Sequence, residues 1–129
     1  MKRKDNSFMD LLESYFSTYL PVAKGLSEKT SFSYKSAFRL FFEFLLTIKG
    51  IPSDKVSFEL IDNRIIEEFL TWLETARNCS VTTRNHRLSA LSAFSIYAQN
   101  RNFSSAMAFR NSILKVPRKK IPRNGRSSF

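Results

Sequence analysis

Two short polar stretches hold the side chains of this chain that are best suited to bind an anionic polymer. The first is Leu-Ser-Glu-Lys-Thr-Ser-Phe-Ser-Tyr-Lys at residues 26–35, and the second is Ser-Val-Thr-Thr-Arg-Asn-His-Arg-Leu-Ser at residues 80–89. Hydroxyls, amides and cations of this kind bond to phosphates and to base edges. Each stretch opens a long apolar periodicity, so each is predicted to form the first turns of a helix, where free N–H groups and the helix dipole favour phosphate.

These residues also have an ordinary alternative role. Ser27, Ser80, Thr82 and Thr83 would cap any helix that began at these positions, and for each residue alone capping is the favoured interpretation. The two clusters taken together with the charge distribution favour DNA binding.

The charge distribution is strongly polarised. The chain has 129 residues, with 21 Lys and Arg against 11 Asp and Glu, and residues 81–129 hold ten of the cations and no acid. A solvated basic tail would explain part of this imbalance. A surface that tracks phosphates explains more of it, because each neutralised phosphate releases counterions. No run of about 18 apolar residues occurs, so we expect no membrane partner.

Residues for catalysis or metal binding are scarce. The only histidine is His86, the only cysteine is Cys79, and Glu67 and Glu68 are adjacent, which places them about 100° apart on a helix. Three glycines cannot build a phosphate loop or a nucleophile elbow. We therefore expect no catalytic site, metal, cofactor or small-molecule substrate in this chain. A single cysteine fits a reducing compartment, so we expect a cytoplasmic location.

The elements that must position the polar stretches are helices. Apolar residues at spacings of three and four predict helices over residues 7–20, 27–49, 61–77, 80–99 and 105–114, the last with the weakest signal. Pro21 and Gly25 are expected to end the first helix, and Gly50 the second. No strand-like alternation is present, so the fold class is all-α, a bundle of four to five helices.

The helical faces are predicted from the same periodicity. On the second helix the apolar stripe is expected to include Leu46 and Ile48 at its end. On the fourth helix Leu88, Leu91, Phe94 and Ala98 face the core. Its outer face then holds Thr82, Asn85, His86 and Ser89, while Arg84 and Arg87 lie nearer the core. The third helix carries Glu67, Glu68 and Glu74, which makes it the poorest candidate to face DNA and the best to face solvent or a protein.

After residue 114 the composition changes. Residues 116–129 hold two prolines, a glycine and five cations, which predicts an extended basic linker over residues 115–129, following a helical domain at residues 1–114. A linker implies a further domain, so we expect the chain to be a piece of a longer protein.

Two motifs carry a family resemblance. The pattern L-S-E-K-T-x-x-x-Y-x-x-x-x-R-x-F-x-x-F at residues 26–44, followed by S-V-T-T-R-N-H-R-L-S-A-L-x-x-F-x-x-Y-A at residues 80–98, resembles the N-terminal core-binding domain of tyrosine recombinases of the phage integrase type. The basic P-R-K-K-I-P-R segment resembles the linker to their catalytic domain. The resemblance covers nearly the whole chain.

The resemblance implies a SAM-like helical bundle that forms half of a clamp around a recombination half-site, with its second and fourth helices at the major groove. Carried over, it implies DNA contacts by Lys29, Thr30, Ser33 and Lys35 on the second helix. On the fourth helix it implies contacts by Thr82, Thr83, Arg84, Asn85, His86 and Ser89, and along the backbone by Arg118, Lys119, Lys120 and Arg123.

The function implied is that of the DNA-binding module of a site-specific recombinase, with double-stranded DNA and other recombinase protomers as partners. The family's Arg–Lys–His–Arg set and tyrosine nucleophile lie in a C-terminal domain to which nothing here corresponds, so this piece is expected to bind DNA and not to cut it. The alternative is a helical protein-interaction domain with a basic tail. An anionic-membrane binder is disfavoured, because Pro117 and Pro122 interrupt any amphipathic helix in the tail.

Overall fold

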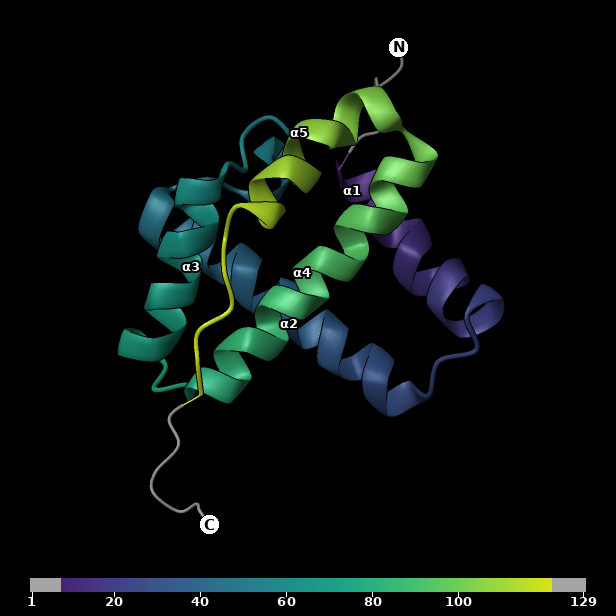
Figure 1. The fold of residues 1–129 in the computed structure, drawn as a ribbon. Helices are drawn as coiled ribbons and strands as arrows, with labels where there is room; N and C mark the ends of the chain where they lie inside the picture. The colour runs from purple at the N-terminus through teal and green to yellow at the C-terminus, as the bar shows by residue number, and fades with distance from the viewer. Residues whose placement is uncertain (1–7, 122–129) are drawn as a thin grey trace.

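Helices from both halves of the chain pack around one aromatic core (Figure 1). The computed structural model describes residues 8–121. Its elements are α1 (Phe8–Ser14), a π-helix η1 (Tyr15–Ala23), α2 (Glu28–Lys49), a 3-10 turn η2 (Ser53–Lys55), α3 (Asn63–Ala76), α4 (Val81–Arg101) and α5 (Phe103–Leu114). Between residues 8 and 121 no strand occurs, so the prediction of an all-α bundle is confirmed.

The starts of α2 and α4 are built in the same way. Ser27 precedes α2, and its Oγ accepts a hydrogen bond of 3.2 Å from the backbone N–H of Thr30. Ser80 precedes α4, and its Oγ accepts a bond of 3.1 Å from the N–H of Thr83. Each serine satisfies one of the N–H groups that a helix start leaves free. Gly50 ends α2 with φ of 70°, a left-handed conformation that glycine adopts without steric cost.

The sequence predicts that the first helix ends at Pro21, but in the structure it does not. It continues through Pro21 to Ala23 as a π-helix, and the N–H of Lys24 bonds to the carbonyl of Tyr19 at 2.8 Å. Proline lacks the N–H of an α-turn and crowds the fourth preceding carbonyl, whereas a π turn uses the fifth. The predicted start at Ser7 lies outside the described residues.

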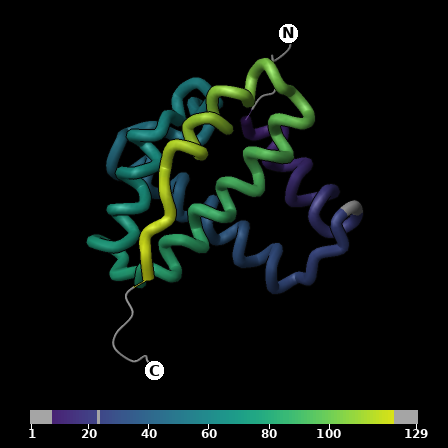
Figure 2. The backbone as a smooth tube through the Cα atoms, viewed as in Figure 1, coloured from purple at the N-terminus to yellow at the C-terminus, as the bar shows by residue number. Residues whose placement is uncertain are grey.

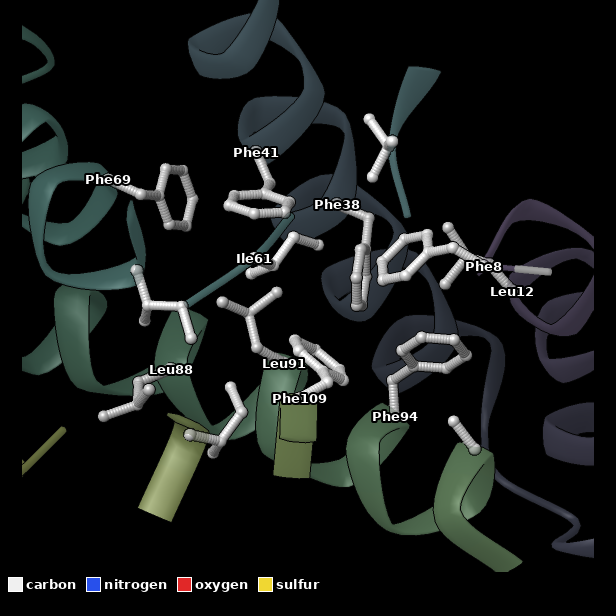
Figure 3. Packing of buried hydrophobic residues seen from close by; sticks show 14 of the residues in the cluster. Phe8, Leu12, Phe38, Phe41, Ile61, Phe69, Leu88, Leu91, Phe94 and Phe109 are labelled. Atoms are coloured by element: carbon white, nitrogen blue, oxygen red, sulfur yellow. The ribbon is translucent and has the colours of Figure 1, made fainter. Parts of the chain in front are cut away.

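The core is a cluster of phenylalanine rings. Phe8, Phe94 and Phe109 come from α1, α4 and α5, and the ring of Phe8 lies 5.3 Å from that of Phe94 and 5.8 Å from that of Phe109 (Figure 3). Phe58, in the connection between α2 and α3, lies 5.1 Å from Phe8 and is buried together with Val56. This connection supplies core residues that helical periodicity gave no reason to expect.

The apolar stripe of α2 ends earlier than predicted. Leu45 is fully buried, but Leu46 and Ile48 are 56% and 55% exposed, so the expectation that these two residues extend the core is wrong. Ile48 instead lines a hollow between α2 and α3 with Trp72 and Glu68. The last turn of α2 meets the more polar side of α3, which cannot bury it fully.

Tyr15 gives the fold an expected sensitivity to alkaline pH. Burial raises the pKa of the Tyr15 phenol, and the neighbouring Tyr34 and Tyr19 raise it further. The folded state therefore favours the neutral phenol. Its contribution to stability is complete below the pKa of an unfolded tyrosine, about 10, and is lost as the pH rises above that value. We expect Tyr15→Phe to reduce the fall in thermal midpoint between about pH 8 and about pH 11. Parallel falls in both proteins would contradict this.

Candidate nucleic-acid interface

The starts of α2 and α4 face one common hollow. The two helices cross, and their N-terminal halves diverge toward the lower edge of the view, where residues 115–121 also end (Figure 1). Between them lies a surface hollow of about 380 Å³, lined by Lys29, Thr30, Ser33, Tyr34, His86 and Ser89. Five of these six residues are among the predicted DNA contacts. The two polar stretches, which start 54 residues apart in sequence, thus form one surface without an acidic side chain in its lining.

Arg87 connects the two walls of this hollow. Its Nη1 donates a hydrogen bond of 3.4 Å to the backbone carbonyl of Ser33, which joins α4 to α2. Its Nε is buried and has no hydrogen-bond partner. The helical period predicts that Arg87 lies nearer the core, and its half-buried position agrees with that prediction. Its link to α2 depends on how the two helices pack and was not predicted.

Two of the predicted DNA-contact residues, Thr30 and Thr83, take part in helix caps. Ser27 Oγ lies 3.2 Å from Thr30 Oγ1, and Ser80 Oγ lies 3.2 Å from Thr83 Oγ1, in addition to the backbone bonds of each cap. Thr83 therefore takes part in a cap, the alternative that the sequence left open for it, and Thr30 takes part in the equivalent cap of α2, which was not predicted. Lys29, Ser33, Thr82 and His86 are exposed and lie on the outer surface of the helix starts.

Arg84 and Asn85 lie inside the protein. Their exposed fractions are 8% and 7%. The expectation that Arg84 lies toward the core is confirmed, but the expectation that Asn85 faces outward is wrong. The segment that follows α5 covers this side of α4, and both side chains bond to its backbone. A helical wheel shows where a side chain points along its own helix, and it cannot show what a distant segment will cover.

The basic segment after α5 begins as part of the domain. Val116 is 5% exposed and belongs to the core, so packing extends two residues past the boundary that composition predicts at residue 114. Arg118, Lys119 and Lys120 are exposed beside the start of α4. Arg118 bonds through Nη2 to Ser89, a residue of the hollow. Arg123 lies outside the described residues.

Lys119 is paired with an acid from α3. Its Nζ lies 2.8 Å from Glu74 Oε1, and the two side chains are 53% and 20% exposed. The acidic helix therefore contributes one carboxylate beside the basic segment. An ion pair this exposed contributes about 0–1 kcal/mol to stability, so Glu74 restrains Lys119 only weakly.

Lys35 does not join the group around His86. It lines a second hollow on the other side of α2, together with Lys29, Phe32 and Pro21. Phe32 is 67% exposed there, because it lies off the stripe that α2 buries. Phe32 therefore does not pack in the core.

Among residues 8–121, no three His, Cys, Asp or Glu side chains are grouped so as to hold a metal ion. No helix within the same range is long and apolar enough to cross a membrane.

Comparison with known proteins gives the family. The model of the phage integrase N-terminal SAM-like domain matches residues 11–115. The chain belongs to this family. The match spans α2, α4 and the hollow between them, so the resemblance drawn from the two polar stretches is confirmed at the level of the family.

Two relatives from Sinorhizobium fredii (strain NBRC 101917 / NGR234) carry related names. "Putative integrase/recombinase y4rC" is 37% identical over 95 residues, which are 74% of this chain and 29% of that protein. "Putative integrase/recombinase y4rD" is 36% identical over 84 residues, 65% of this chain and 30% of that protein. The chain thus spans about a third of the length of these relatives. No solved structure matches the chain significantly.

Proposed function

We propose that this domain binds duplex DNA as the N-terminal module of a site-specific tyrosine recombinase. The starts of α2 and α4 approach the major groove, and the basic segment after α5 follows the phosphate backbone. The chemistry of strand cutting and rejoining belongs to a separate domain of such a recombinase. This module binds the DNA and orients it. Other recombinase protomers are its further partners.

One observation carries the proposal. Lys29, Ser33, His86 and Ser89 come from two distant stretches and line one hollow that no acid enters. None of these four side chains takes part in the caps formed by Ser27 and Ser80, so capping does not account for their convergence. The convergence supplies short hydroxyl and imidazole groups for base edges and phosphates, beside two helix N-termini.

The proposal is tested by titrating a fluorescent duplex oligonucleotide with the protein. We expect binding at about 50 mM salt that weakens steeply as salt rises, because phosphate contacts release counterions. No detectable binding at about 50 mM salt would overturn the proposal. An affinity that did not change with salt would also contradict it.

Sequence preference should depend on the exposed side chains of α4. We expect Thr82→Ala and His86→Ala to change the ranking of a randomised pool of duplexes, with a loss of about 1–3 kcal/mol of discrimination at one base pair. Thr71→Ala, at an exposed position on α3, is the matched control and should leave the ranking unchanged. Equal rankings for all of these proteins would assign Thr82 and His86 to backbone contacts or to none.

A second candidate function is protein interaction through α3. It is favoured by a hollow of about 590 Å³ between α2 and α3, where Ile48 and Trp72 lie beside Glu67 and Glu68. Sedimentation of the protein with and without duplex DNA separates the two functions. A defined oligomer that is insensitive to DNA would favour the second.

A further inference from the structure

Residues 115–121, here called the strap, run back along α4 toward its start (Figure 2). Val116 anchors the strap in the core, and beyond Pro117 it has no regular secondary structure. Its neighbours on either side are α3, through Glu74, and α4, through Asn85 and Ser89. An extended backbone outside a sheet must find partners for its N–H and carbonyl groups among side chains or water.

The side chain of Asn85 bonds to both the backbone N–H and the backbone carbonyl of one strap residue, Lys119. Its Nδ2 donates to the carbonyl of Lys119 at 2.8 Å, and its Oδ1 accepts from the N–H of Lys119 at 3.0 Å. A side-chain amide that pairs in this way imitates a neighbouring strand. Because Asn85 is 7% exposed, these bonds are shielded from competing water.

Arg84 also attaches the strap to α4, and its bonds add to those of Asn85. Its Nη1 donates to Asn85 Oδ1 at 2.9 Å and to the carbonyl of Pro117 at 3.2 Å. The guanidinium therefore orients the amide of Asn85 and holds the strap at a second point. Little of either side chain remains exposed while these bonds persist.

The attachment determines where two cations lie. Arg118 Nη1 donates to the backbone carbonyl of Asn85 at 3.1 Å, and its Nη2 bonds to Ser89. Lys119 Nζ points to the other side and reaches both carboxylate oxygens of Glu74, at 2.8 and 3.2 Å. The strap thus extends the cationic surface of the α4 start.

We propose that Arg84 and Asn85 are positioning residues that hold the strap as a fixed part of the DNA-binding surface and do not contact DNA themselves. The inference rests on the proposed function. A strap that is already ordered in the free protein loses little conformational entropy when Arg118, Lys119 and Lys120 meet phosphates. A released strap would have to be ordered at each binding event, so affinity would fall with no DNA contact removed.

The first test compares Asn85→Ala with Asn100→Ala, an exposed position on the same helix. Amide hydrogen exchange of the strap and affinity for a duplex oligonucleotide are measured for both. We expect Asn85→Ala to speed exchange at the Lys119 amide by about tenfold or more and to weaken DNA binding by about tenfold. Exchange in the buried middle of α4 should not change, and Asn100→Ala should match the wild type.

The second test leaves Asn85 in place. Lys119→Pro and Lys119→Ala both remove the ammonium group, but only the proline variant removes the N–H that bonds to Asn85. If the strap attachment sets affinity, Lys119→Pro binds DNA about tenfold more weakly than Lys119→Ala. Equal affinities of these two variants, together with weak binding by Asn85→Ala, would mean that Asn85 contacts DNA directly.

Other outcomes separate this inference from the proposed function. Unchanged exchange in Asn85→Ala, or faster exchange with unchanged affinity, would overturn the positioning role alone. Failure of the wild-type protein to bind duplex DNA at about 50 mM salt would overturn the proposed function and this inference with it.

Discussion

Replacing Arg118, Lys119 and Lys120 together with alanine is expected to weaken binding to duplex DNA by about a hundredfold at about 0.1 M salt. These three cations are exposed on the strap beside the start of α4. Each phosphate contact contributes about 0.9 to the slope of log K against log salt, so the loss of three contacts should reduce that slope by about 2–3. The loss should be nearly the same for every duplex sequence, because phosphates carry no base identity. Fluorescence anisotropy over a series of salt concentrations measures both quantities.

The matched control removes three cations that lie away from the starts of α2 and α4. Lys49, Lys55 and Arg64 lie at the end of α2, on η2 and on α3, and their replacement changes the net charge by the same amount. We expect this variant to bind within about threefold of the wild type, since charges about a Debye length or more from the DNA are screened. Equal losses in the two triple variants would mean that overall charge, and not the strap, determines affinity.

Replacing Phe94 with alanine is expected to destabilise the domain by about 3–5 kcal/mol, which is a large part of the total stability of a domain of this size. Phe94 is fully buried in the middle of α4. Its ring meets that of Phe8 at 5.3 Å and that of Tyr15 at 5.3 Å, so its loss opens a cavity between α4 and the first helix (Figure 3). Thermal unfolding followed by circular dichroism should show a midpoint lower by about 15–25 °C.

Phe103→Ala serves as the comparison for Phe94→Ala. Phe103 begins α5 and is 58% exposed, so its removal leaves no cavity and should change stability by no more than about 0.5 kcal/mol. A midpoint for Phe94→Ala within a few degrees of that for Phe103→Ala would show that the aromatic cluster is not the centre of the core.

The helices and the polar positions at their starts could be predicted from local pattern. The starts of α2 and α4 follow Ser27 and Ser80, whose side chains cap within three residues, so the information lies in adjacent positions. The buried set Leu88, Leu91, Phe94 and Ala98 follows from the helical period. The family could be predicted for the same reason, because its motifs are these local patterns.

The tertiary structure decided which polar residues remain available. Thr82, Asn85 and His86 are equivalent on a helical wheel, yet Thr82 and His86 are exposed while Asn85 is buried under a segment 34 residues away. Likewise, Glu74 belongs by its sequence to the acidic helix but pairs with Lys119, 45 residues away. Periodicity determines which way a side chain points along its own helix, because that depends on a few neighbouring residues. What covers the side chain depends on how distant segments pack, and that is set by the fold as a whole.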